Sequence, residues 1–153
     1  MFPEWLRAKY AFQDTLKPDM VVIGTPDRIF SEYRGEKTNF TQDILNACCW
    51  HDEAIVVDPE EAVLIKLTAN ALASTKISFA NMIYLICKKR DLRSDVVMNA
   101  IKKDPRCSPV YLTPGSSFGG YCLPKDTEEL SNCSSNGLLK AVLQINEKMK
   151  ELE

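Results

Sequence analysis

The feature that most constrains this chain is a long apolar stretch without helix breakers. No glycine or proline occurs between Ala62 and Cys87, and apolar side chains fall on nearly every face of a helix drawn through them. Before this run, Asp58 as N-cap and Glu61 three residues later have the form of a capping box, and three basic residues follow the run. The sequence therefore predicts one helix of about 30 residues, about 45 Å long.

A helix of this length and apolarity has more surface than the rest of one small domain can cover. The chain has 153 residues, which is enough for a single packed domain and hardly enough for two. We therefore expect a partner on the uncovered face, in the simplest case a homodimer through the long helix. A membrane span is not expected, because polar side chains interrupt the run, namely Lys66, Asn70, Lys76 and Asn81.

Charge and cysteine usage narrow the class of protein further. The 19 basic and 21 acidic side chains give a formal charge of -2, whereas a nucleic-acid-binding protein normally carries a basic excess. The first residues lack the basic and apolar regions of a signal peptide. The six cysteines are irregularly spaced in a chain large enough to need no disulfides, so we expect reduced cysteines and a cytoplasmic protein.

One group of soft metal ligands stands close together in the sequence. Cys48 and Cys49 lie just before His51, which is the only histidine. No second cluster completes a tetrahedral site, so we predict no metal centre. A small zinc protein stays open as an alternative, and it requires stoichiometric metal in the purified chain.

The remaining pattern predicts a mainly α fold. Residues 58–153 are expected to form a helical domain around the long helix, and residues 1–57 a short α/β part with two or so strands. The expected elements, in chain order, are a strand at 20–24, a surface helix with a loop at 29–49, a strand at 54–57, and helices at 94–103 with Ser94 as N-cap, from about Pro124, and at 137–151.

A loop rich in proline, glycine and serine precedes the most reactive side chain. Gly119 and Gly120 allow the backbone to approach a ligand closely. Cys122 follows just ahead of the helix expected from Pro124, whose free amides favour a thiolate. Lys125 acts in the same direction, while Asp126 opposes it and is placed to orient a water. A structural cysteine is the competing interpretation.

Two polar side chains of the long helix sharpen this hypothesis. Lys66 and Asn70 are four residues apart and therefore project from one face. Such a pair can hold the oxyanion formed when Cys122 attacks a carbonyl group. Alternatively, the lysine reaches solvent beside an asparagine whose hydrogen bonds are satisfied. The spacing leaves both interpretations open.

Several segments in the same order resemble one enzyme family. The run EAVLIKLTANA at 61–71 and TKISFAN at 75–81 resemble the central helix of the UDP-glucose/GDP-mannose dehydrogenase family, and FGGYCLPKDT at 118–127 looks like its catalytic-cysteine motif. Further matching segments are 3–7, 18–19 and 22–24 at the end of its cofactor domain, the D-x-R turn at 104–106, and 138–147 after the active site.

This resemblance implies oxidation of the C6 alcohol of a nucleotide sugar to a carboxylate, with two NAD(P)+. The aldehyde intermediate is captured by the cysteine as a thiohemiacetal, oxidised to a thioester and hydrolysed. By position, Cys122 would be the nucleophile, and Lys66 and Asn70 would stabilise the oxyanion. Asp126 would orient the hydrolytic water, and Glu4 would match an acid/base glutamate.

The resemblance also implies substrate and cofactor contacts. Arg106 would reach the nucleotide sugar bound to the neighbouring subunit of a homodimer. Lys125 would contribute to the NAD site. The residues matching the sugar pocket and its approach loop are Tyr111, Leu112, Phe118, Gly119 and Gly120.

The chain departs from the family pattern in two respects. Ala8 stands where the family usually has a second glutamate, and no G-x-G-x-x-G follows a strand. We therefore expect residues 1–57 to be the end of a dinucleotide-binding domain and residues 58–153 to be the central domain. We expect this chain to be inactive without the rest of the enzyme. The alternative is a helical dimerisation module without catalysis, its cysteine unused.

Overall fold

The computed structural model describes residues 2–3, 16, 18, 20–25, 43, 45–48 and 54–153. Glu4, Ala8, Cys49, His51 and most of the helix expected at 29–49 lie outside the described residues. The chain packs into two compact units, Met1–Ile65 and Lys66–Glu153. The domain boundary expected after residue 57 stays a prediction.

A small sheet forms the described part of the first unit. Its strands, in spatial order, are β1 (Phe2–Pro3), β2 (Val21–Gly24) and β3 (Ile55–Val57). β2 pairs antiparallel with β1 and parallel with β3. Val21 and Ile23 point to one face of β2 and pack with Leu45 into a small core. The predicted strands near 20–24 and 54–57 are thus confirmed.

Gly24 ends β2 where the backbone passes close to the start of the long helix. A β-carbon at Gly24 would lie 2.9 Å from Pro59 Cα and 3.1 Å from Ala62 Cβ, and neither atom belongs to a flexible side-chain end. This contact requires a residue without a side chain.

We expect Gly24→Ala to lower the free energy of unfolding by about 1–3 kcal/mol, the usual effect of overpacking. Urea denaturation followed by circular dichroism measures this change. Gly119→Ala is the matched control, because nothing lies within 4 Å of a β-carbon placed there. Equal losses in the two variants would contradict the close approach at Gly24.

The long helix is present as predicted. Helix α3 (Pro59–Lys89) has 31 residues, two acidic residues in its first turn and two basic residues in its last. The Asp58 backbone N–H donates to Glu61 Oε2 at 3.1 Å, which is one half of the predicted capping box. Beyond the C-terminus, Asp91 adopts a left-handed conformation and the Leu92 N–H donates to the Cys87 carbonyl, so a Schellman-type turn ends the helix. No described helix has the combination of length and apolarity that a bilayer crossing needs.

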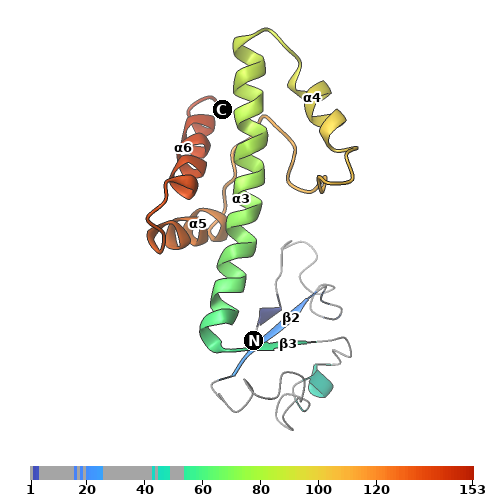
Figure 1. Cartoon of the computed structure of the whole chain (residues 1–153), viewed down its shortest axis with the longest axis vertical. Helices are drawn as coiled ribbons and strands as arrows, with labels where there is room; N and C mark the ends of the chain where they lie inside the picture. The colour runs from blue at the N-terminus through green and yellow to red at the C-terminus, as the bar shows by residue number, and fades with distance from the viewer. Residues whose placement is uncertain are drawn as a thin grey trace. The chain divides into compact units, whose positions relative to one another are not determined.

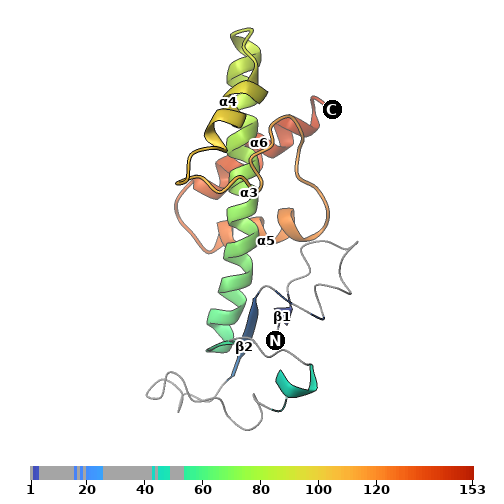
Figure 2. The same ribbon diagram turned by 90° about the vertical axis from the view of Figure 1, so that its right-hand side faces the viewer.

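The second unit surrounds α3 with three shorter helices: α4 (Ser94–Ile101), α5 (Cys122–Asn132) and α6 (Leu138–Lys150). Figures 1 and 2 show α5 and α6 on one side of α3 and α4 on the other. On the α4 side, Ala80 of α3 packs with Met98 and Leu112 in a buried cluster. The mainly α fold predicted from the sequence is confirmed.

Two predicted helix starts are wrong. Ser94 is the first residue of α4 and not its N-cap, a position that Arg93 occupies without a side-chain cap. Helix α5 begins at Cys122, two residues earlier than the start expected near Pro124. Proline is tolerated anywhere in the first turn of a helix, where amides have no intrahelical acceptor, so Pro124 does not mark the first residue. Cys122 therefore belongs to the helix itself.

Candidate active site at the start of α5

A buried hydrogen bond joins the long helix to the helix that begins with the cysteine. Asn70 Nδ2 of α3 donates to Asp126 Oδ2 of α5 at 2.6 Å. Both side chains are buried, and Asp126 is only 1% exposed. The partner of the Asn70 carboxamide is thus itself one of the predicted site residues, and the contact fixes α5 against α3.

The Asp126 carboxyl is held in its charged form. Burial raises its pKa, but hydrogen bonds from Lys125 and Asn70 act against burial. The positive charges of Lys125 and Lys66 act in the same direction, so the pKa lies below its ordinary value of 3.8. The charge of Lys66 lowers the pKa of Asp126, so Lys66 lies in the same site as Asn70, which is one helical turn further along α3.

Lys125 is partly exposed to solvent, unlike the buried Asp126. Its ammonium group donates to Asp126 Oδ1, and this hydrogen bond raises the lysine pKa above 10.5. The side chain is 46% exposed and lies over the Tyr121 ring at 5.9 Å from the centroid. Lys125 therefore pairs with the buried carboxylate from the solvent side, where the predicted contact with a cofactor is sterically open.

Cys122 is exposed at the N-terminal end of α5. Asp126 follows four residues later, so the two side chains are neighbours on one face of the helix. The turn just before the cysteine needs glycine, because Gly120 has a φ of +76°. No atom lies within 4 Å of an added β-carbon at Gly119 or Gly120, so the space beside these residues is open.

A second buried contact fixes α5, and sequence reasoning did not find it. The hydroxyl groups of Thr127 and Ser74 lie 2.8 Å apart, and Thr127 Oγ1 also donates to the Leu123 carbonyl at 2.7 Å. Both side chains are fully buried. Thr127 is part of the cysteine motif, and Ser74 lies four residues after Asn70 on the same face of the long helix, which is the signal that could have singled out the pair.

Two buried asparagines hold the loop before Cys122, and sequence reasoning assigned neither a role. Asn81 of α3 is hydrogen-bonded to the backbone of residues 115 and 116, and Asn146 of α6 to the backbone of Phe118. A buried carboxamide on an apolar helix face was the signal used for Asn70, and it applied equally to these two side chains.

The predicted substrate-binding residues lie in unlike surroundings. Arg106 is 86% exposed, and its guanidinium group makes a two-point ion pair with Asp104. Tyr111 is exposed with a φ of +63°. Leu112 and Phe118 are buried, so neither presents its side chain to a ligand from within this chain.

Cys48 is half-buried, while its neighbours Cys49 and His51 fall among the residues whose structure is not described. Over the described ranges, no three His, Cys, Asp or Glu side chains gather into a metal site. The five described cysteines are free thiols.

Comparison with known sequences identifies the group to which this arrangement belongs. The sequence profile of the UDP-glucose/GDP-mannose dehydrogenase family, central domain, matches residues 60–148, more than half of the chain. The chain belongs to the UDP-glucose/GDP-mannose dehydrogenase family. The matched residues include Lys66, Asn70, Cys122 and Asp126.

Individual members of the family resemble the chain over most of its length. UDP-glucose 6-dehydrogenase YwqF of Bacillus subtilis is 35% identical over 150 residues, which cover 94% of this chain and 32% of that protein. UDP-glucose 6-dehydrogenase of Streptococcus pneumoniae is 32% identical, covering 97% and 39%. GDP-mannose 6-dehydrogenase of Pseudomonas putida is 37% identical over 133 residues, covering 84% and 28%.

A solved structure in the family is also similar. The UDP-glucose dehydrogenase from the hyperthermophilic archaeon Pyrobaculum islandicum matches with a TM-score of 0.75 and 33% sequence identity, over 95% of this chain and 33% of that one. The chain thus spans about a third of the length of the family members that it matches.

Proposed function

We propose that this chain is the catalytic-cysteine and dimerisation portion of a nucleotide-sugar 6-dehydrogenase. The observation that carries the proposal is the Asn70–Asp126 hydrogen bond, which joins the two helices that bear Lys66 and Cys122. The names of the relatives support a UDP- or GDP-sugar as substrate. The proposed reaction takes the C6 alcohol to a carboxylate.

In this proposal the chain acts through a covalent bond to its cysteine. The Cys122 thiolate attacks the C6 carbon of the aldehyde, and the carbonyl electron pair moves onto oxygen. Lys66 and Asn70 stabilise this oxyanion. Asn70 has the capacity for this role, because its amide carries two protons and only one is donated to Asp126.

Loss of hydride from C6 of the thiohemiacetal leaves a thioester on Cys122. Water then attacks the thioester carbon, the carbon–sulfur bond breaks, and the carboxylate product and the thiolate separate. Asp126 orients this water, since each of its oxygens retains a second lone pair. Glu4, outside the described residues, is the proposed acid/base group for the hydrolysis.

NAD or NADP is the proposed acceptor of both hydrides. Among the described residues only Lys125 is a candidate contact, because no glycine-rich turn between a strand and a helix is present there to hold a pyrophosphate. Residues 1–57 are proposed to be the end of a dinucleotide-binding domain, and the chain alone is expected not to reduce NAD(P)+.

The proposed substrate contacts involve both copies of a homodimer. Arg106, exposed and paired with Asp104, is proposed to contact the nucleotide sugar of the neighbouring copy. The proposed dimer contact is a row on α3 formed by Leu72, Phe79 and Ile86, which are seven residues apart and 59%, 48% and 44% exposed. Such a repeat of apolar side chains suits a facing helix.

The nucleophile can be tested in the chain without any cofactor. We expect p-nitrophenyl acetate to acylate Cys122, releasing p-nitrophenolate and leaving an acetyl thioester that water hydrolyses. Cys133 is the internal control, because it is the other exposed described cysteine and lies at the opposite end of α5. Acylation should be at least about 10-fold slower in Cys122→Ala and little changed in Cys133→Ala. Equal acylation rates in the two variants would favour the alternative, a helical dimerisation module without catalysis.

The oxidation itself needs the missing portions of the enzyme. In a chimera, this chain replaces the matching 150 residues of YwqF, and NAD+ reduction is measured with UDP-glucose, UDP-galactose and GDP-mannose. We expect turnover with one of these sugars and a loss of at least about 10³-fold in Cys122→Ala. A folded chimera that is inactive with every sugar, or equally active without Cys122, contradicts the proposed function.

A further inference from the structure

The segment before Cys122 depends on side chains for its hydrogen bonds. Residues 113–120 form no helix or strand, so their backbone groups lack the partners that regular structure provides. Phe118 is nevertheless buried, which takes its own backbone N–H and carbonyl away from water. Buried backbone groups of this kind require other partners.

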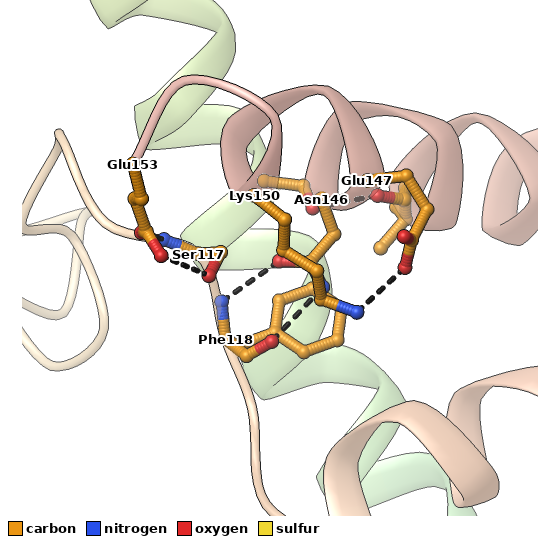
Figure 3. Close-up of polar contacts among 8 residues, drawn as sticks. Ser117, Phe118, Asn146, Glu147, Lys150 and Glu153 are labelled. Atoms are coloured by element: carbon orange, nitrogen blue, oxygen red, sulfur yellow. Dashed lines mark hydrogen bonds and ion pairs between the residues drawn. The ribbon is translucent and has the colours of Figure 1, made fainter.

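Asn146 supplies both partners for one residue of this segment. Its Oδ1 accepts a hydrogen bond from the Phe118 N–H at 2.7 Å, and its Nδ2 donates to the Phe118 carbonyl at 2.9 Å (Figure 3). The asparagine is 1% exposed on α6. A carboxamide offers one acceptor and one donor side by side, as a neighbouring strand does, and aspartate cannot donate.

Asn81 repeats the arrangement from the other side of the segment. Its Oδ1 accepts from the Gly115 N–H at 2.9 Å, and its Nδ2 donates to the Ser116 carbonyl at 2.8 Å. This side chain is fully buried on α3. Two helices distant in sequence therefore fix the segment by the same chemistry. Figure 3 also shows Ser117, which is hydrogen-bonded to Glu153.

The fixed segment ends at Phe118, four residues before the cysteine. Only Gly119, Gly120 and Tyr121 separate Phe118 from Cys122, and all three are exposed. On the other side of the cysteine, α5 is fixed to α3 through Asp126 and Thr127. The backbone at Cys122 is thus held on its N-terminal side by Phe118 and on its C-terminal side by α5. Loss of the Phe118 hydrogen bonds removes the N-terminal restraint.

We propose that Asn146, together with Asn81, is a positioning residue for the nucleophile: the two buried carboxamides fix the segment before Cys122 and so align its thiolate with a carbonyl carbon. This inference rests on the proposed role of Cys122 as the nucleophile. A misplacement of a reacting group by about 1 Å lowers rates by as much as 10²-fold, so the alignment has a measurable effect.

The structure offers a control that separates positioning from stability. Ser78 of α3 donates to the Val142 carbonyl of α6 at 2.8 Å, in a buried contact between the same two helices. Within the described part of the chain, its hydroxyl makes no hydrogen bond to the segment before the cysteine. Ser78→Ala therefore weakens the packing of α3 against α6 and leaves residues 115–118 in place.

The experiment compares Asn146→Asp with Ser78→Ala in the 153-residue chain. Urea denaturation gives the loss of stability, hydrogen exchange reports the Phe118 amide, and p-nitrophenyl acetate gives the acylation rates of Cys122 and Cys133 by mass spectrometry. We expect Asn146→Asp to increase exchange at residues 115–121 and to slow acylation of Cys122 about 10-fold, with Cys133 unchanged. Ser78→Ala should lower the urea midpoint and change neither local readout.

Asn81→Asp is the second variant, used if Asn146→Asp does not fold, and it should act in the same direction. The inference is overturned if Ser78→Ala slows Cys122 as much as the asparagine variants at equal loss of stability. It is also overturned if exchange increases while acylation is unchanged. If wild-type Cys122 reacts no faster than Cys133, the proposed function fails instead, and the exchange data alone then decide whether Asn146 holds the segment.

Discussion

Replacing Asp126 by asparagine should lower the free energy of unfolding by about 2 kcal/mol, the usual contribution of a buried hydrogen bond to a charged group. The variant keeps the size of the side chain and removes its negative charge. Asn70 then loses a charged acceptor, and Lys66 and Lys125 lose the anion between them. Urea denaturation at neutral pH measures the difference.

The pH dependence of that difference identifies the charge as its cause. Because the pKa of Asp126 is lowered in the folded chain, its stabilising effect is complete above the ordinary value of 3.8 and is lost as the pH falls through the folded pKa. The difference in stability between wild type and Asp126→Asn should therefore begin to shrink below about pH 4 and disappear below the folded pKa. A difference that persists in acid contradicts this assignment.

Activity provides a second readout for the same variant. If Asp126 orients the hydrolytic water, acylation of Cys122 by p-nitrophenyl acetate should be retained, while hydrolysis of the acetyl thioester should slow by about 10²-fold. Asp95→Asn is the matched control, since Asp95 pairs with Arg93 at the surface and is 58% exposed. This control should leave both steps and the stability nearly unchanged.

Phe79→Glu should weaken the proposed homodimer. Phe79 is the middle residue of the apolar row on α3, and it is 48% exposed, so the change disturbs the packing within one copy less than a change at a buried position. In a twofold-symmetric dimer each interface residue counts twice, so losing two half-buried phenylalanines removes about 3 kcal/mol and raises the dissociation constant about 10²-fold. Sedimentation velocity over a range of concentrations measures the constant.

Leu138→Glu provides the control for the dimer prediction. Leu138 is 62% exposed at the start of α6, outside the row, so the same chemical change is made at a similar exposure. It should leave the dissociation constant unchanged. A monomeric wild-type chain, or equal effects of the two substitutions, would exclude the row on α3 as the dimer contact.

The bounds of the long helix were predictable because local chemistry determines them. The absence of glycine and proline from Ala62 to Cys87 and the acidic residues at the start act within a few positions of one another. The start of α5 was predicted wrongly, since Pro124 fits any position of a first turn. Local rules of this kind fix the type of element more firmly than its first residue.

The partners of buried polar side chains were harder to predict. Asn70 and Asp126 are 56 positions apart, and Asn146 and Phe118 are 28 apart. Helical periodicity shows that an asparagine faces the interior, but it contains no information about the acceptor waiting there. The resemblance to a family gave roles to Asn70 and Asp126 separately, and only the folded structure showed that they bind each other.

The two exposed cysteines of α5 also determine how the chain responds to oxidation. Cys122 and Cys133 stand at opposite ends of a helix, about 16 Å apart along its axis, whereas a disulfide requires Cα atoms within about 7 Å. These two thiols therefore cannot cross-link within one molecule while α5 is folded. Air-oxidised samples that pair them will contain covalent dimers and larger species, which a reducing agent separates. These species differ from the dimer proposed to form through Leu72, Phe79 and Ile86.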